Sequence, residues 1–289
     1  MVIYNLFDLT LMVTFPNAKI NIGLDILRKR ADGYHDISTV MMPISWKDIL
    51  EIVPSKGVSD TLSVSGRGVN CAPEHNIVMK AVAAMRKVAD FPAVDIFLHK
   101  VIPDGAGLGG GSADAAFALR TLNDMFSLGL KCECLVDVAA TLGADCPFFI
   151  FNRPMLCEGT GAEMSCFELN LPKNVTLAVI KPPVSVPTRD AYSAVSPEIP
   201  EESLGTLLHD LEINQWQGRV KNDFEHSVMA IYPIIGAIKD ALLGAGAVYA
   251  SMSGSGSSVY GLFIDADCDT LTEHLKSQFP GCDMIVERM

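Results

Sequence analysis

Apolar and polar positions alternate in one stretch of the chain and then change to a helical spacing across a run of glycines. Three apolar residues, Val94, Ile96 and Leu98, alternate with polar or charged neighbours, which predicts a half-buried strand over residues 93–101. Beyond residue 113, apolar residues recur at spacings of four, three and four, as on one face of a helix: Ala115, Leu119, Leu122 and Phe126. The pattern therefore predicts a strand, a glycine loop and a helix in that order.

The loop between these two elements holds five glycines within residues 102–114. Glycine lets the backbone turn sharply and approach a ligand closely, because no Cβ is in the way. The N–H groups at the start of the helix point into such a loop, and the helix dipole favours an anion there. One or two glycines are enough for a tight turn without a ligand, so five of them favour a phosphate-binding loop.

The sequence of the loop distinguishes between the known kinds of phosphate loop. The Walker form requires a lysine after the last glycine, and Ser112 stands there instead. The spacing of Gly105, Gly107 and Gly110 satisfies the dinucleotide-binding pattern, but the acidic residue expected about 20 positions later is not evident. A dinucleotide-dependent oxidoreductase remains a weaker alternative, because it leaves the polar residues described below unexplained.

The rest of the chain contains mixed strand and helix patterns. Strands are predicted over 15–24, 37–43, 48–53, 61–64 and 175–180, and helices over 76–89, with His75-Asn76 at its N-cap, 134–142, 189–195 and 227–243. A strand, a Ser/Gly turn and a strand are predicted over 244–263, and a helix followed by a strand over 267–287. The pattern loosens around residues 151–163, so we place a boundary there, between a domain of residues 1–155 and one of residues 156–289.

Two charged residues stand in apolar surroundings. Lys19 shares a strand face with Asn21, two positions away, and Asp145 is a single carboxylate within an apolar run. Burying an unpartnered charge is costly, so a functional interpretation puts Asp145 beside a cation such as Lys19. The alternatives are a solvated edge strand for Lys19 and a turn or helix cap for Asp145.

Two further segments carry weaker signals. Tyr34 and His35 follow an Asp-Gly turn, and such a pair can stack on a base and hydrogen-bond its edge, although simple packing is the commoner role. The small residues of the Ser/Gly turn permit a close approach to the phosphate loop, but an ordinary hairpin turn has the same composition.

Composition narrows the class of protein. The 289 residues are 49% apolar, and the net charge of −12 argues against binding to nucleic acid or anionic membranes. The eight cysteines form no metal-binding spacing, which predicts reduced thiols and a cytoplasmic protein. Residues 1–13 have neither the basic region of a signal peptide nor the length to span a bilayer, and Met12 is an alternative start.

Three segments in order resemble the motifs of the GHMP kinases. Residues 16–21 (PNAKIN) resemble the first motif, residues 103–112 the second and residues 252–259 the third. Residues 30–35, 142–147, 186–188 and 222–225 resemble the branch that phosphorylates the 2-hydroxyl of a cytidylated small molecule in isoprenoid precursor biosynthesis. The resemblance implies an α+β fold of two domains with the active site in the cleft between them, ATP as phosphoryl donor, Mg²⁺, and no obligate protein partner.

The resemblance also implies roles for individual residues. Lys19 and Asp145 match the catalytic pair, and Asn21, Tyr34, His35, Thr188 and Tyr192 match the substrate side. The positions that match the ATP site are Asn76, Lys100, Pro103, Asp104, Gly105, Ala106, Gly107, Leu108, Gly109, Gly110, Gly111, Ser112 and Ala113. Those of the third motif are Ser253, Gly254, Ser255 and Gly256. Mg²⁺ is expected to bridge phosphate oxygens, mostly through water, with Ser112 as a candidate ligand and no carboxylate ligand identified.

This chain departs from the family pattern at a few positions. Ala113 replaces a second serine of the loop, Tyr192 stands where phenylalanine is common, and Ser253 and Ser255 stand where some members carry threonine. None of these changes removes a chemical function. A nucleotide-binding sensor without catalysis and another small-molecule GHMP kinase remain alternatives.

Overall fold

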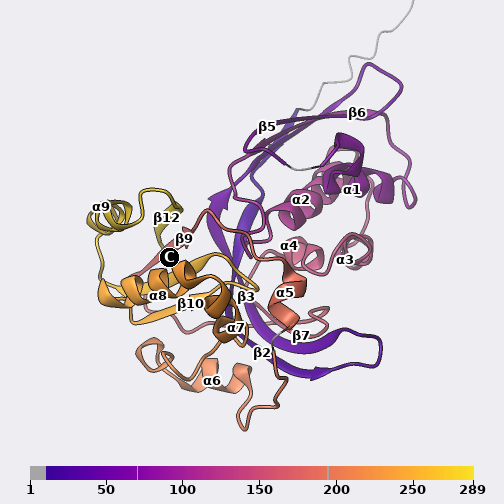
Figure 1. Cartoon of the computed structure of the whole chain (residues 1–289). Helices are drawn as coiled ribbons and strands as arrows, with labels where there is room; N and C mark the ends of the chain where they lie inside the picture. Colours follow the sequence, from indigo (N-terminus) through magenta and orange to yellow (C-terminus); the bar gives the residue numbers. More distant parts are fainter. Residues whose placement is uncertain (1–10, 70, 194) are drawn as a thin grey trace, which may run out of the picture. The chain divides into compact units, whose positions relative to one another are not determined.

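A computed structural model describes residues 11–69, 71–193 and 195–289, and the chain forms two compact units (Figure 1). The first unit comprises Met1–Asn17, Lys47–Ile102 and Gly110–Phe151, of which residues 1–10 and 70 are not described. The second comprises Ala18–Trp46, Pro103–Gly109 and Asn152–Met289. Each unit combines helices with sheets, so the α+β class is confirmed. The boundary at residue 155 stays a prediction.

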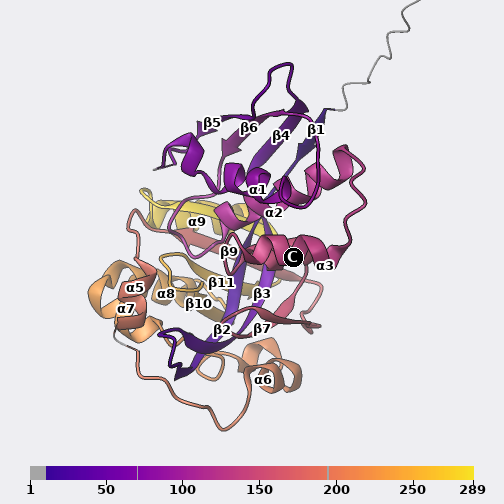
Figure 2. The same ribbon diagram turned by 90° about the vertical axis from the view of Figure 1, so that its right-hand side faces the viewer.

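The first unit consists of one four-stranded sheet with helices on one face (Figure 2). The strand order is β1-β4-β6-β5, and only the β5–β6 pair is parallel. The strands are β1 Met12–Thr14, β4 Ile49–Pro54, β5 Thr61–Gly66 and β6 Val94–Lys100. The helices are the short 3₁₀ turn η1 Pro73–His75, α1 Ile77–Met85, α2 Gly110–Met125, α3 Cys132–Ala140 and α4 Cys146–Phe151.

The predicted strand, loop and helix around the glycines are confirmed. In β6 the side chains of Val94, Ile96 and Leu98 are buried, as the alternation requires. In α2 the side chains of Ala115, Leu119 and Leu122 are buried, as the helical spacing requires. Helix α2 begins at Gly110, inside the glycine run, so its first N–H groups belong to the loop.

The second unit contains two four-stranded sheets, both antiparallel in the pairs that are resolved. The first sheet has the order β2-β3-β7-β8: β2 Asn17–Lys29, β3 His35–Lys47, β7 Met155–Gly159 and β8 Glu163–Cys166. The second has the order β10-β11-β9-β12: β9 Val175–Lys181, β10 Tyr249–Met252, β11 Val259–Ile264 and β12 Asp283–Arg288. Its helices are α5 Thr188–Ser193, α6 Leu204–Asp210, η2 Ile213–Gln215, α7 Glu225–Ile231, α8 Pro233–Gly244 and α9 Cys268–Gln278.

Helices α8 and α9 pack against the second of these sheets (Figure 1). All seven residues of β9, between β11 and β12, are buried, which explains the apolar run from Leu177 to Ile180 within it. Ile235, Ile238 and Leu242 of α8 form part of the core that also includes Ala178 and Ile180 of β9. The Ser/Gly turn connects β10 to β11, and nearly all residues of these two strands are buried.

Two helix predictions need correction. The single helix predicted over 227–243 is wrong: α7 ends at Ile231, α8 begins at Pro233, and the two axes are bent by 116°. Proline has no N–H to continue the first helix, but its fixed φ suits the first position of the next. The short helix α4 was not predicted, because six residues are too few to show a periodicity.

Candidate active site

The main chain of the glycine loop lies against the Ser/Gly turn within the second unit. Gly107 has a φ of +72°, and a Cβ built on it would lie 2.1 Å from the carbonyl oxygen of Ser253. No side chain fits in that space, so glycine is required at this position both by conformation and by contact. The Ser258 N–H also donates to the carbonyl of Ala106, at 3.1 Å. The close approach of the turn to the loop, one of the two interpretations that its small residues permit, is therefore present in the structure.

The strand β2 joins the same meeting point. The Lys19 N–H donates to the carbonyl of Leu108 at 2.9 Å, and the Asn21 N–H donates to Ser253 Oγ at 3.2 Å. Ser253 Oγ in turn donates to the carbonyl of Gly107 at 2.9 Å. Segments that are more than 230 residues apart in sequence thus converge on two consecutive peptide groups of the loop.

The side chains of Lys19 and Asn21 are buried, so the solvated-strand interpretation is wrong. Lys19 Nζ donates to Asn21 Oδ1 at 2.5 Å, and Asn21 Nδ2 donates to Thr39 Oγ1 at 3.1 Å. A Cβ built on Gly254 would lie 3.7 Å from Lys19 Nζ, so the ammonium group reaches the Ser/Gly turn. A buried cation beside a phosphate-type loop is suited to stabilise negative charge that develops on a transferred group.

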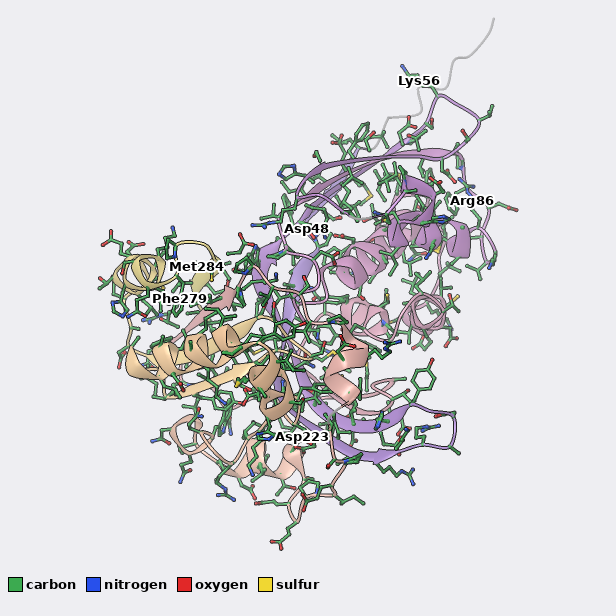
Figure 3. All side chains as sticks on the ribbon, viewed as in Figure 1. Asp48, Lys56, Arg86, Asp223, Phe279 and Met284 are labelled. Carbon is green, nitrogen blue, oxygen red and sulfur yellow. The ribbon has the colours of Figure 1, made fainter. Side chains whose placement is uncertain are left out.

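In the first unit, Lys100 lies within a cluster of buried charges at the end of β6. Its Nζ donates to Asp48 Oδ2 and, at 2.6 Å, to Asp114 Oδ2. Asp48 Oδ1 accepts the N–H groups of Val101 and Ile102, at 2.6 and 2.8 Å, and so fixes the entry to the glycine loop. Asp48 is labelled in Figure 3. Among the described residues, the Oδ1 atom of Asp114 has no hydrogen-bond partner.

The cluster shifts the pKa of Asp114 and that of Lys100. Burial is the main cause that raises the pKa of Asp114 to about 8; Lys100 opposes this rise and Asp48 adds to it. Burial works against the charge of Lys100, but Asp114 and Asp48 together raise the pKa of its ammonium group. A proton on Asp114 leaves one ammonium and one carboxylate, which balances the cluster. Sequence reasoning missed Asp48 and Asp114, although Asp114 is the one charged residue within positions 113–119.

The starts of α1 and α2 lie close together in the first unit. Asn76 is the N-cap of α1, as predicted, and its Oδ1 accepts the Val78 N–H at 2.9 Å. A Cβ on Gly111 would lie 3.7 Å from Ile77 Cγ2. Asn76 is therefore near the loop, but contact with a nucleotide stays a prediction.

Asp145 immediately precedes α4, also in the first unit, and is partly exposed. The next residue, Cys146, is buried, and its thiol hydrogen-bonds with the side chain of Ser112 in the first turn of α2. Burial is the main cause that raises the pKa of this thiol to about 11. Asp145 is therefore the neighbour in sequence of a residue, Cys146, that contacts the first turn of α2. Lys19 belongs to the second unit, so a meeting of Lys19 with Asp145 stays a prediction.

The aromatic rings of His35, Tyr192 and Phe224 form a cluster in the second unit. The rings of His35 and Tyr192 are stacked, with centroids 4.8 Å apart, and Phe224 meets the edge of Tyr192 at 4.8 Å. The Tyr34 side chain is 68% exposed, so packing does not account for it. Thr188 begins α5, but its side chain lies outside the part of the chain that the structure describes. Phe224 was not among the predicted site residues.

Metal and membrane features are few. Within residues 11–69, 71–193 and 195–289, no group of three or more His, Cys, Asp and Glu side chains is arranged to hold a metal ion. All eight cysteines are free thiols, as predicted. In the same ranges no single helix is long and apolar enough to cross a membrane; α7 and α8 meet that test only together, across their bend of 116°.

Comparison with protein families places this site in a known class. The model of the GHMP kinases N terminal domain matches residues 76–153, and that of the GHMP kinases C terminal domain matches residues 195–280. The class is therefore that of the GHMP kinases.

Individual relatives narrow the class further. The chain is 49% identical over 254 residues to the 4-diphosphocytidyl-2-C-methyl-D-erythritol kinase of Bacteroides fragilis, covering 87% of this chain and 92% of that protein. It is 48% identical over 252 residues to the enzyme of the same name from Parabacteroides distasonis, with the same two shares. The chain belongs to the 4-diphosphocytidyl-2-C-methyl-D-erythritol kinase family.

Solved structures agree with this placement. A crystal structure of 4-(cytidine 5'-diphospho)-2C-methyl-D-erythritol kinase superposes with a TM-score of 0.77 and 30% identity, covering 95% of this chain and 98% of that one. A homoserine kinase from Cytophaga hutchinsonii superposes with a TM-score of 0.69 at 20% identity, which shows that the fold is shared.

Proposed function

We propose that this protein transfers the γ-phosphoryl group of ATP to the 2-hydroxyl of 4-diphosphocytidyl-2-C-methyl-D-erythritol, giving the 2-phosphate and ADP. The observation that carries the proposal is the convergence of Lys19, the glycine loop and the Ser/Gly turn on the peptide groups of Gly107 and Leu108. The family's relatives carry this activity in their names, and the three converging segments are those that resemble the three kinase motifs.

The triphosphate is proposed to lie in the loop of residues 103–113. The N–H groups of the first turn of α2 and the helix dipole supply positive potential there, and Lys19 adds a full charge. Asn76 and Lys100 are proposed to lie near the nucleotide. Mg²⁺ fits this donor set, because it prefers oxygen ligands and commonly uses substrate phosphates with few protein groups. The Ser112 hydroxyl would hold it, and the ion would neutralise charge on the phosphate oxygens.

Asp145 and Lys19 are proposed to serve the transfer itself. Phosphoryl transfer depends mainly on positioning and on stabilisation of charge. Asp145 would orient the 2-hydroxyl and accept its proton. Lys19 would keep Asp145 ionised and stabilise the transferring group. For this the side chains of Lys19 and Asp145 must both reach the γ-phosphoryl group.

The cytosine is proposed to bind among the aromatic side chains. Tyr34 and Tyr192 would stack on the two faces of the base, and His35 would hydrogen-bond its edge. The exposed ring of Tyr34 and the ring cluster around Tyr192 support this arrangement. Asn21 and Thr188 are proposed to contact the rest of the substrate. A site that hydrogen-bonds the base rejects substrates that lack those groups.

The remaining proposals concern partners and cellular location. The net charge of −12 and the sequence pI of about 4.9 support a cytoplasmic protein that binds neither nucleic acid nor membranes. Its substrate is a small molecule, and no obligate protein partner is proposed. As family domains, residues 1–155 and 156–289 are proposed to form the two halves.

A substrate screen tests the proposed function. ADP release is followed with the cytidylated erythritol, mevalonate, homoserine and galactose as acceptors, each with ATP and Mg²⁺. We expect turnover with only one of these four acceptors, the cytidylated compound. Phosphorus NMR of the product would locate the new phosphate at the 2-position. Preferred turnover of another acceptor would replace the substrate assignment, and ATP-independent binding of a nicotinamide cofactor would support the oxidoreductase alternative.

A further inference from the structure

A second segment, residues 222–225 at the start of α7, also contacts the Ser/Gly turn. Asn222, which is buried, donates from Nδ2 to the carbonyl of Met252 at 2.7 Å and to that of Gly254 at 2.8 Å. Its Oδ1 accepts the N–H of Phe224 at 3.0 Å. One amide side chain thus uses both of its N–H donors on the turn and is itself fixed by the backbone that follows it.

Glu225 makes a second connection three residues later. Its Oε1 accepts the Met252 N–H at 2.8 Å and the Ser251 hydroxyl at 3.0 Å. Its Oε2 pairs with Nζ of Lys239 in α8. The carboxylate is therefore attached to the core helix α8 on one side and to the last residues of β10 on the other. Hydrogen bonds to a carboxylate are stronger than those between neutral groups.

These contacts bracket one residue of the turn. The carbonyl groups before and after Ser253 are bound by Asn222, and the N–H of Met252 is bound by Glu225. Ser253 itself donates to the carbonyl of Gly107 and accepts the N–H of Asn21. Asn222 and Glu225 thus fix the backbone on both sides of Ser253. Ser253 in turn contacts Gly107 of the glycine loop through its hydroxyl and through its carbonyl oxygen.

We propose that Asn222 and Glu225 are positioning residues of the kinase reaction: they hold the Ser/Gly turn against the glycine loop and thereby set the affinity for ATP. The proposal rests on the proposed function, because it concerns the nucleotide that the kinase uses. Neither side chain reacts, and each acts through the backbone of the turn. A loosened turn frees the carbonyl of Gly107, so the loop's N–H groups lose the fixed geometry that binds phosphate.

The chemistry of the two residues is specific to the task. Only an amide side chain offers two N–H donors and an acceptor together, so aspartate at position 222 would face two carbonyl oxygens with no donor. Glutamine at position 225 would keep one acceptor oxygen for the turn but lose the ionic partner of Lys239. Ser251→Ala would remove only one of the bonds that Glu225 accepts. These three changes form a graded series from severe to mild.

Asp223 supplies a matched control from the same segment. Its Oδ2 accepts the N–H of Ile26 in β2, at 2.7 Å, rather than a group of the turn; Asp223 is labelled in Figure 3. Asparagine in its place keeps an acceptor for that bond. Asp223→Asn therefore alters the segment without altering the bracket around Ser253.

The test measures ATP and substrate separately in the full-length protein. We expect the KM for ATP, and the dissociation constant of a non-hydrolysable ATP analogue, to rise roughly 10- to 100-fold in Asn222→Asp. Smaller rises are expected in Glu225→Gln and then in Ser251→Ala, with the KM for the cytidylated substrate changed less than about threefold. Hydrogen exchange at residues 252–258 should rise in the same order, while Asp223→Asn resembles the wild type.

Several outcomes separate the two proposals. Normal ATP affinity in the series, with faster exchange in the turn, would overturn the positioning role while leaving the kinase assignment intact. An equal rise in both KM values would also overturn it, since that points to a general loss of structure. Should Asn222→Asp fail to fold, the mild Ser251→Ala variant still decides the matter. A wild-type protein that neither binds ATP nor releases ADP would remove both proposals.

Discussion

Two buried lysines, one in each unit, look alike in sequence but differ in their surroundings. Lys100 stands at the end of a strand with two carboxylates as partners, Asp48 and Asp114. Lys19 lies in β2, and its Nζ donates to the neutral amide of Asn21 beside the Ser/Gly turn. The comparison teaches that burial alone does not make a lysine catalytic. The charge of Lys100 is balanced by carboxyl groups of the protein, whereas Lys19 is the lysine that we propose acts on a ligand.

The largest effect on turnover is expected from a substitution of Asp145, the carboxylate that Lys19 is proposed to keep ionised. Asp145→Asn should lower turnover by about 10²- to 10⁴-fold, because an amide cannot accept the proton of the hydroxyl. Binding of ATP should remain nearly unchanged. Coupled ADP release and titration with an ATP analogue measure the two quantities, and turnover close to that of the wild type would remove Asp145 as the base.

Lys100→Met should mainly affect folding. It leaves the buried side chains of Asp48 and Asp114 without their common cation, and removing one partner of a buried ion pair typically costs about 3–5 kcal/mol of unfolding free energy. Urea unfolding measures this cost, and the exposed Lys56→Met serves as the control (Figure 3). Lys19→Met should lose activity with a smaller loss of stability. Equal losses of unfolding free energy in Lys100→Met and Lys19→Met would contradict the contrast drawn between the two lysines.

Substitution of Tyr34, which we propose stacks on the cytosine, should leave the free energy of unfolding unchanged. Tyr34 is 68% exposed, so Tyr34→Ala removes a ring that contributes little to the core. Loss of one stacked base costs about 1–3 kcal/mol, so the KM for the cytidylated substrate should rise about tenfold or more. The KM for ATP should change much less. Steady-state kinetics with each substrate varied in turn tests this, and equal increases would count against stacking.

The smallest effect is a change in the pH dependence of stability. Burial raises the pKa of Asp114 from the ordinary 3.8 to about 8, so the folded protein binds this proton more tightly than the unfolded chain does. The stability that it contributes is complete below about pH 4 and is lost as the pH rises towards 8. Asp114→Asn should flatten this decline and be relatively more stable at pH 9. Urea midpoints at pH 5, 7 and 9 measure it.

Asp60→Asn is a control of opposite sign. Burial opposes the shift, but the Arg86 guanidinium and the Val94 N–H lower the pKa of Asp60 below its ordinary value. The stability that Asp60 contributes is present above that ordinary value and is lost as the pH falls through the lowered pKa. Asp60→Asn should therefore be destabilising at pH 7 and less so in acid. The same trend in both variants would contradict the assignment for Asp114.

Local patterns predicted most of the fold. The alternation in β6, the stripe of α2 and the N-cap Asn76 each depend on residues within one element, and each is confirmed. The close approach of the Ser/Gly turn to the glycine loop, one of the two interpretations that its small residues permit, is present in the structure as well. The bend at Pro233 was visible in the sequence, but the continuous apolar pattern on either side of it concealed the break.

The partners of these residues could not be predicted. Asp48 is 52 positions from Lys100, and Met252 is 30 positions from Asn222. Side chains this far apart meet only through the packing of sheets and helices, for which a single sequence carries no signal. The roles of Lys19 and Asp145 in the reaction remain predictions for the same reason.

The contact at Gly107 has a consequence for engineering chimeric kinases. Because the loop meets the Ser/Gly turn through peptide groups, with 2.1 Å between a Cβ at position 107 and the carbonyl oxygen of Ser253, no compensating side chain can be introduced at that joint. A graft that brings in the turn of another enzyme must also bring in the matching loop. The aromatic residues that we propose bind the base lie outside this joint and can be redesigned on their own.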